Sequence, residues 1–254
     1  MVVVALAIVA AGALFAGLSY AFKARLAFTA AEGHNDITGF VFATVGVLYG
    51  VLLAFVVVAV WDEFTNAEDD VRQEAALMVA AYRDTQLFPD AQRVDAQADF
   101  RAYARALVAA RWSTYDQANG NRPLDLLNPI YADYRAIRPT NELESDQLTA
   151  AMDHVYALEV ERQTRHMSLN ERLPPVFWLV LVIGGLITIA FVFVFQFSSR
   201  RVHAGLTGML AASIVAVLAL VLALHGPYSG LVQVGRSPYA NALLQFDAID
   251  RGEG

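Results

Sequence analysis

The chain has 254 residues, of which 57% are hydrophobic and only 17% are charged, so its composition favours a membrane protein over a soluble domain. The formal net charge of −7 argues against nucleic acid as a partner, because phosphate contacts need a basic face. The absence of cysteine excludes disulfides, thiolate catalysis, iron–sulfur clusters and thiolate zinc sites.

Apolar residues are gathered in four blocks, each long enough to cross a bilayer as a helix. About 20 apolar residues span the hydrocarbon core. The blocks are Val2–Phe22, Phe40–Val60, Val176–Phe197 and Val202–Leu224. The first block could instead be a signal peptide, but it has no basic residue before it and exceeds the usual signal core, which favours a membrane anchor. The sequence therefore predicts an all-α polytopic membrane protein with four transmembrane helices.

The second block continues without proline or glycine into a strongly acidic stretch, which predicts one long helix that leaves the membrane and ends before Pro89. Seven-residue spacing places Asp62 with Asp69, and Glu63 with Asp70, on one helical face. The acidic side chains are either a solvated face or, in a ring of subunits, negative rings at a pore mouth that attract cations or bind a divalent ion. The candidates for such a mouth are Asp62, Glu63, Asp69, Asp70 and Glu74.

The polar segment between the second and third blocks is predicted to be helical. Apolar stripes at helical spacing predict helices over about 90–112, 124–137 and 141–173. Asn141 followed by Glu144 matches a broad form of the capping box. The predicted regions are a membrane hairpin over 1–61, an extramembrane segment over 62–175, a second hairpin over 176–225 and a tail over 226–254.

Small residues recur every three or four positions in the second and fourth blocks. In the second block they are Gly39, Ala43, Gly46, Gly50 and Ala54, and in the fourth they are Gly208, Ala212, Ala216, Ala219 and Ala223. Such stripes let helix backbones approach closely in lipid. They indicate either packing within a four-helix bundle or an oligomer interface or pore wall.

Basic residues in the short loops predict the orientation. Lys23 and Arg25 follow the first block, and Arg200 and Arg201 separate the third from the fourth. The positive-inside rule therefore places these loops in the cytoplasm and residues 62–175 outside it.

The tail begins where Gly226-Pro227 breaks the fourth helix. Residues 231–234 are expected to form a short strand. Ser237 suits an N-cap with Pro238 at the first helical position, which predicts a final short helix.

No motif points to catalysis, a cofactor or a metal. The interiors of the four blocks carry no ionisable side chain, which argues against proton-coupled carriers, pumps and voltage sensors. Within these blocks Ser213 is the candidate nucleophile, and no His or Lys lies at the same depth in the membrane. No nucleotide-binding or metal-ligand spacing occurs, so the sequence predicts no catalytic residue, no cofactor, no metal site and no enzyme.

Residues 46–75, 171–185 and 225–243 together resemble a bacterial membrane family of unknown function that is called bestrophin-like. The resemblance includes the tail motif Pro227, Tyr228, Ser229 and Gly230, although Tyr228 stands where phenylalanine is expected. The resemblance implies a bacterial inner (plasma) membrane location. Bestrophins themselves are oligomeric anion channels with four spans and a pore lined by the second helix.

The resemblance to bestrophins implies a homo-oligomer in the lipid bilayer that acts as a passive channel or pore for inorganic ions. The candidate pore or packing positions are Gly46, Tyr49, Gly50, Leu53, Val56 and Val60. The residues that follow Trp61 are acidic rather than basic, which argues against assigning the anion selectivity of bestrophins to this chain. The alternative is a non-conducting membrane scaffold or sensor whose acidic segment binds a partner or a divalent cation.

Overall fold

The computed structural model describes residues 2–25, 34–109, 112, 126–168, 173–195 and 199–253. Within these ranges the chain is helical and contains no strand, which confirms the all-α prediction. The chain divides into two compact units. Unit 1 comprises Met1–Asp62 and Arg172–His225, and unit 2 comprises Glu63–Glu171 and Gly226–Gly254.

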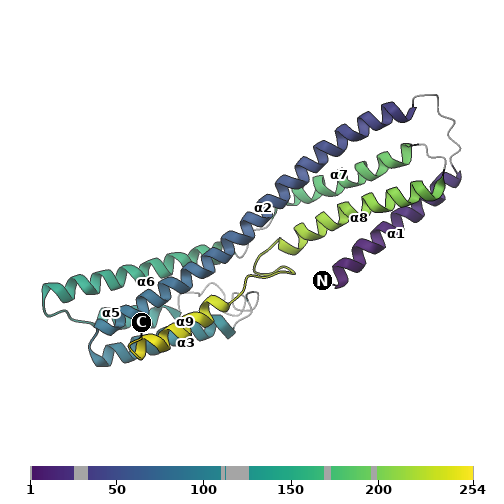
Figure 1. Ribbon diagram of the computed structural model, residues 1–254. Coiled ribbons are helices and arrows are strands. Elements are labelled where there is room, and N and C mark those ends of the chain that lie inside the picture. The colour runs from purple at the N-terminus through teal and green to yellow at the C-terminus, as the bar shows by residue number, and fades with distance from the viewer. Residues whose placement is uncertain are drawn as a thin grey trace. The chain divides into compact units, whose positions relative to one another are not determined.

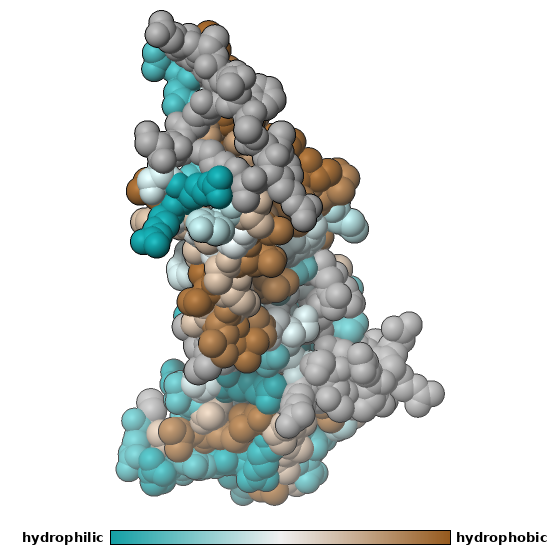
Figure 2. Space-filling model, turned by 90° about the vertical axis from the view of Figure 1, so that its right-hand side faces the viewer, coloured by the Kyte–Doolittle hydropathy of each residue, from teal (hydrophilic) through white to brown (hydrophobic). Residues whose placement is uncertain are grey.

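Unit 1 contains helices long and apolar enough to cross a membrane. They are α1 (Val2–Arg25), the first part of α2 (His34–Asp84), α7 (Pro175–Val194) and α8 (Arg200–Leu224). Each corresponds to one predicted block, which confirms the four spans. Figure 1 shows α1 and α8 side by side, and Figure 2 shows hydrophobic side chains dominating the visible face of this unit. A membrane helix needs such an apolar surface because lipid solvates it.

Backbone contact at two glycines explains the packing of α1 on α8. A Cβ atom added at Gly208 would lie 2.9 Å from the carbonyl oxygen of Gly12, and one added at Gly12 would lie 3.1 Å from the carbonyl oxygen of Gly208. Only hydrogen fits on either side, so the two helices approach more closely than side chains allow. Gly208 and Ala212, two members of the small-residue stripe of α8, therefore pack against α1 within the protomer.

Unit 2 combines the rest of α2 with short helices and the tail. These elements are the 3₁₀ turn η1 (Thr85–Leu87), α3 (Asp90–Ala109), α5 (Asn128–Ala136), α6 (Glu142–Ser168) and α9 (Ser237–Asp250). Its core is aromatic. Tyr82 of α2 stacks on Phe246 of α9 at 3.9 Å between ring centroids, and Phe100 of α3 meets Tyr82 edge-on at 6.1 Å. Burial of these large rings contributes to the hydrophobic stabilisation of unit 2.

Local sequence signals predicted most helix ends and failed in the tail. The capping box is confirmed, because the backbone N–H of Glu144 donates to Oδ1 of Asn141 at 2.9 Å. The predicted strand over 231–234 is wrong: the described residues include no strand that could pair with it, and the N–H of Val234 donates to the carbonyl of Pro227 at 2.8 Å in a loop. Ser237 is already helical and Arg236 is the N-cap, so the predicted cap is off by one residue.

Candidate functional site

The buried side of α2 in unit 1 carries four of the predicted pore positions. Tyr49, Leu53, Val56 and Val60 are 1–9% exposed within the single protomer. The hydroxyl of Tyr49 donates to the carbonyl oxygen of Leu181 on α7 at 2.8 Å. These side chains therefore face the interior of the protomer, so in this structure they are packing positions.

Two consecutive glycines on α7 make room for the Tyr49 ring. A Cβ atom at Gly184 would lie 2.6 Å from Cδ2 of Tyr49, and one at Gly185 would lie 2.9 Å from its hydroxyl. The ring thus lies directly against the α7 backbone. In the sequence, the Gly184-Gly185 pair was the signal that could have indicated a close contact on this side of α7.

The remaining two pore candidates lie on a different side of α2. Gly46 and Gly50 are not buried, and a Cβ atom on either would meet nothing within 4 Å. Ala43 and Ala54 on the same face are exposed as well. Unlike Gly208 of α8, the two glycines of α2 are not used for packing inside the protomer. This open small-residue face is the strongest candidate for contact with another helix.

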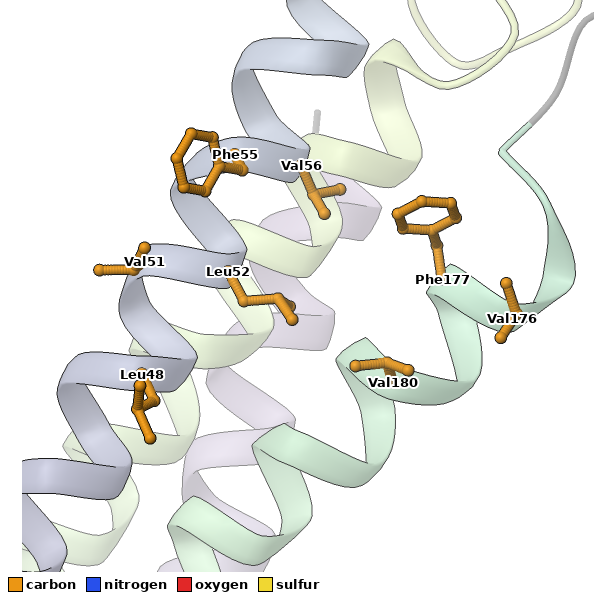
Figure 3. A pocket seen from close by; sticks show the side chains of 8 residues that line it. All are labelled: Leu48, Val51, Leu52, Phe55, Val56, Val176, Phe177 and Val180. Carbon is orange, nitrogen blue, oxygen red and sulfur yellow. The ribbon is translucent and has the colours of Figure 1, made fainter.

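On its other flank, α2 forms an apolar groove with α7 of about 520 Å³. Figure 3 shows Leu52 and Val56 of α2 and Phe177 and Val180 of α7 pointing into the space between the two helices. Nothing polar lines the groove: the residues are Leu48, Val51, Leu52, Phe55, Val56, Val176, Phe177 and Val180. A groove of this composition in a membrane helix pair suits acyl chains and offers no site for an ion.

A neutral polar cluster is buried between α1 and α8. The hydroxyl of Ser19 lies 2.9 Å from Nδ1 of His203, whose Nε2 lies 2.8 Å from the carbonyl oxygen of Val192. A carbonyl oxygen only accepts, so Nε2 carries a proton, and in a neutral imidazole Nδ1 then accepts from the Ser19 hydroxyl. Thr207 lies 3.3 Å from the same serine oxygen. Ser19, His203 and Thr207 are 0–1% exposed. The cluster is satisfied and closed to a substrate, which fits helix packing better than catalysis.

The sequence analysis missed this Ser–His pair. Its members are 184 residues apart and lie near the ends of the first and fourth blocks. Ser213, the nucleophile candidate of the sequence analysis, donates only to the carbonyl oxygen of Met209 on its own helix at 2.9 Å.

The predicted acidic mouth divides into exposed and buried members. Glu63, Asp69 and Asp70 line a groove of about 450 Å³ together with Thr164 and Ser168 of α6. Asp62, also exposed, does not line this groove. Within the described residues no three His, Asp or Glu side chains stand together as a metal site would require.

Glu74 does not belong to an exposed acidic mouth, because it is completely buried at the centre of unit 2. Its two carboxylate oxygens accept from Tyr103 of α3 at 2.5 Å, from Tyr239 of α9 at 2.5 Å and from Nε of Arg165 of α6 at 2.6 Å. One carboxylate on α2 therefore connects three other helices. We call these four residues, Glu74, Tyr103, Arg165 and Tyr239, the Glu74 cluster.

Burial controls the ionisation of the Glu74 cluster. It raises the pKa of Tyr103 and Tyr239 well above the usual value, and the nearby negative charge of Glu74 raises them further. Both phenols are therefore neutral donors. The pKa of Arg165 is also raised: burial opposes its charge, but Glu74 and the hydrogen bonds to it outweigh this effect. Trp112 covers the Arg165 guanidinium, with 5.2 Å between Cζ and the ring centroid.

The tail motif packs inside unit 2. Gly226 adopts φ +76°, and its carbonyl oxygen accepts from the backbone N–H groups of Ser229 and Gly230, which forms a tight turn. Tyr228 is 2% exposed, and its hydroxyl donates to the carbonyl oxygen of Ala67 on α2 at 3.2 Å. Burial raises the pKa of Tyr228 to about 12. Pro227 lines the acidic groove described above.

Chemically, the described residues offer buried hydrogen bonds, a buried ion pair and apolar surfaces. No accessible nucleophile with a base is found among them. Sequence reasoning did not find the Glu74 cluster, because its members come from four helices and share no local spacing. The signal that could have pointed to it was Arg162 and Arg165 on the apolar line of a helix, where charged residues are rarely buried without a partner.

Comparison with known proteins identifies one family model. A model described as the bestrophin-like domain matches residues 3–239, which covers nearly the whole chain. Among curated proteins, the protein GrpE of Alkaliphilus oremlandii (strain OhILAs) is 34% identical over 102 residues, or 40% of this chain and 52% of that protein. The chain thus spans about half the length of this relative. No solved structure matches.

Proposed function

Because the chain belongs to the bestrophin-like family, we propose that it assembles into a homo-oligomer that forms a passive ion channel in the membrane. The proposal includes a bacterial inner membrane location, with residues 62–175 on the extracytoplasmic side. No catalytic turnover is part of it.

One observation carries this proposal: the small-residue face of α2 has no packing partner among the described residues of the protomer. Gly46 and Gly50 are open to an approaching helix, whereas Tyr49 and Leu53 are already packed inside. In an oligomer, Gly46 and Gly50 would contact a second copy or border a central path. Uncharged helix surfaces in lipid associate by close packing of this kind. The lining of the proposed pore is therefore this open face rather than the Tyr49 side.

Cysteine crosslinking tests the oligomer, since the natural chain has no cysteine. Gly50→Cys in native membranes should form disulfide-linked dimers on mild oxidation. Gly205→Cys is the matched control, because Gly205 on α8 also has nothing within 4 Å but is not on α2. Equal crosslinking at both positions, or none at Gly50, contradicts an interface on α2.

Conduction is tested with purified protein in planar bilayers. Single-channel currents under an ion gradient support the channel, and their absence under all gradients and membrane tensions rejects it. Reversal potentials in asymmetric salt would identify the ion. Replacing Tyr49 with Phe should leave selectivity unchanged, because its hydroxyl is bound to Leu181 within the protomer.

The acidic groove favours a second candidate function, a non-conducting scaffold or sensor. Glu63, Asp69 and Asp70 border the groove together with Thr164 and Ser168, and although they do not form a preassembled metal site, their oxygens are of the kind that hard divalent cations prefer. Isothermal titration with Ca²⁺ or Mg²⁺ tests it. Simultaneous neutralisation of Asp62, Glu63, Asp69 and Asp70 should abolish cation binding if the groove is the site, and should alter ion selectivity if the acids border a pore.

A further inference from the structure

Two arginines on one face of α6 are buried in unit 2. Arg162 and Arg165 lie one turn apart and are only 3% and 2% exposed. Both lie close enough to Tyr103 for their charges to act on its hydroxyl. Buried arginines ordinarily have an acidic partner for each guanidinium, because desolvating an unpaired charge is costly.

Arg165 uses only part of its hydrogen-bonding capacity on Glu74. Its Nε and Nη2 donate to the two carboxylate oxygens, at 2.6 and 3.5 Å. Its Nη1 is buried and donates to no acceptor in the structure. A guanidinium has five N–H donors in a planar fork, so this free edge points away from Glu74.

Arg162 adds a second buried donor without an acceptor. Its Nη2 is buried and, like Nη1 of Arg165, has no hydrogen-bond partner. In the Glu74 cluster and Arg162 taken together, Glu74 supplies one negative charge, while Arg162 and Arg165 supply two positive charges. Tyr103 and Tyr239 stay neutral because burial raises their pKa. One buried positive charge is therefore left uncompensated by these side chains.

We propose that Arg162 and Arg165 hold a small monovalent anion in the interior of unit 2, bound by the free N–H groups of the two guanidiniums. The matching chemistry is a halide or a small carboxylate such as formate, which accepts charge-assisted hydrogen bonds from both arginines. The anion supplies the missing negative charge. The proposal does not depend on the proposed channel function.

Trp112 provides a direct reporter of this site. Its ring centroid lies 5.2 Å from Cζ of Arg165, and the residue is only 3% exposed, so dissolved ions do not collide with it freely. In detergent-solubilised protein with Trp61→Phe and Trp178→Phe, Trp112 is the single tryptophan. Iodide, which quenches tryptophan on contact, should then quench it along a saturating curve. Chloride and formate should each relieve the quenching by displacing iodide if the site accepts both ions. Chloride alone should relieve it if the site accepts only halides.

Replacing one arginine separates binding from general quenching. Arg162→Gln should weaken the saturable iodide quenching roughly tenfold or more, the loss expected for a charged hydrogen bond. Arg105→Gln is the matched control, because Arg105 is an exposed arginine on α3. Quenching that rises linearly with iodide, to the same extent in both variants and the parent, would overturn the proposal.

A stability measurement covers the case in which Arg162→Gln folds poorly. In the unmodified protein, replacing gluconate by chloride at equal ionic strength should raise the unfolding temperature of unit 2, because an anion that binds only the folded state stabilises it. An unchanged unfolding temperature over the full chloride range would also overturn the proposal.

Discussion

The two units of this protein use opposite kinds of contact to hold their helices together. In unit 1, Gly12 and Gly208 bring two backbones into direct contact, and the buried polar side chains around His203 are neutral. In unit 2, helices of mixed composition are joined by a buried ion pair between Glu74 and Arg165 and by stacked aromatic rings. The difference follows from the solvent. Lipid gives no hydrophobic gain between helices and penalises charge, whereas water rewards burial of rings and permits one well-satisfied ion pair.

The largest effect should come from removing the acid at the centre of unit 2. Glu74→Ala leaves Arg165 buried without its counter-charge and two tyrosine hydroxyls without an acceptor, so we expect a loss of about 3–5 kcal/mol in the free energy of unfolding. Urea unfolding of the solubilised protein with Trp61→Phe and Trp178→Phe, followed by Trp112 fluorescence, measures this loss. Asp69→Ala is the control, because its side chain is 71% exposed and should cost nothing measurable.

A double variant shows whether the ion pair itself or the unpaired charge is responsible for that loss. Glu74→Leu with Arg165→Met removes both charges of the ion pair and should be less destabilising than Glu74→Ala alone, because neither charge of the pair is left buried without its partner. If the double variant is as unstable as the single variant, the hydrogen bonds of the two tyrosines rather than the charges hold unit 2 together.

In unit 1 the corresponding change is steric. Gly208→Val would place its Cβ 2.9 Å from the Gly12 carbonyl oxygen, so α1 must move, and we expect a loss of about 1–3 kcal/mol. Gly205→Ala on the same helix is the control. Its Cβ meets nothing within 4 Å, so it should be neutral or stabilise the helix by about 0.5–1 kcal/mol. Thermal unfolding in detergent compares the two variants. Equal effects would show that the α1–α8 contact is not close.

The sequence predicted unit 1 better than unit 2, and the reason is physical. A membrane helix is recognised from a single run of apolar residues, because lipid imposes the same requirement on every turn. The four spans were found in this way. The sequence did not indicate which side of each span faces the neighbouring helices. All sides of the membrane part of α2 are apolar, so Tyr49 and Gly50 could not be assigned to the interior or the outer surface of the protomer.

In unit 2 the local signals were read correctly but the long-range partners were not. The Asn141–Glu144 cap lies within four residues and was predicted, whereas Glu74 bonds to a residue 91 positions away. An acid in an acidic stretch looks like its neighbours from sequence alone. Only the arrival of Arg165 and two tyrosines from other helices distinguishes Glu74 from Asp70.

A smaller effect is expected for the neutral cluster of unit 1. Ser19→Ala removes the donor to Nδ1 of His203 and should cost about 0.6–1.7 kcal/mol, the range found for hydrogen bonds between membrane helices. Thermal unfolding in detergent measures it, with Ser213→Ala as the control because that hydroxyl bonds only within α8. A loss as large as that of Glu74→Ala would contradict the contrast between the two units.

The smallest effect should be a pH dependence confined to unit 2. Burial raises the pKa of Asp133 to about 6, and the charges of Asp99 and Asp95 add to the shift. The folded state then holds this proton more tightly than the unfolded state. The resulting stability is complete below about pH 4, is lost as the pH rises through about 6, and amounts to about 1 kcal/mol or less because Asp133 is only half-buried.

Unfolding temperatures at pH 5 and pH 7.5 test this titration. Asp133→Asn, which stays neutral at both values, should be more stable than the parent at pH 7.5 and should reduce the difference between the two temperatures. Asp146→Asn, an exposed acid on α6, should leave that difference unchanged. A pH dependence of the same size in Asp133→Asn and in the parent would show that Asp133 is not its source.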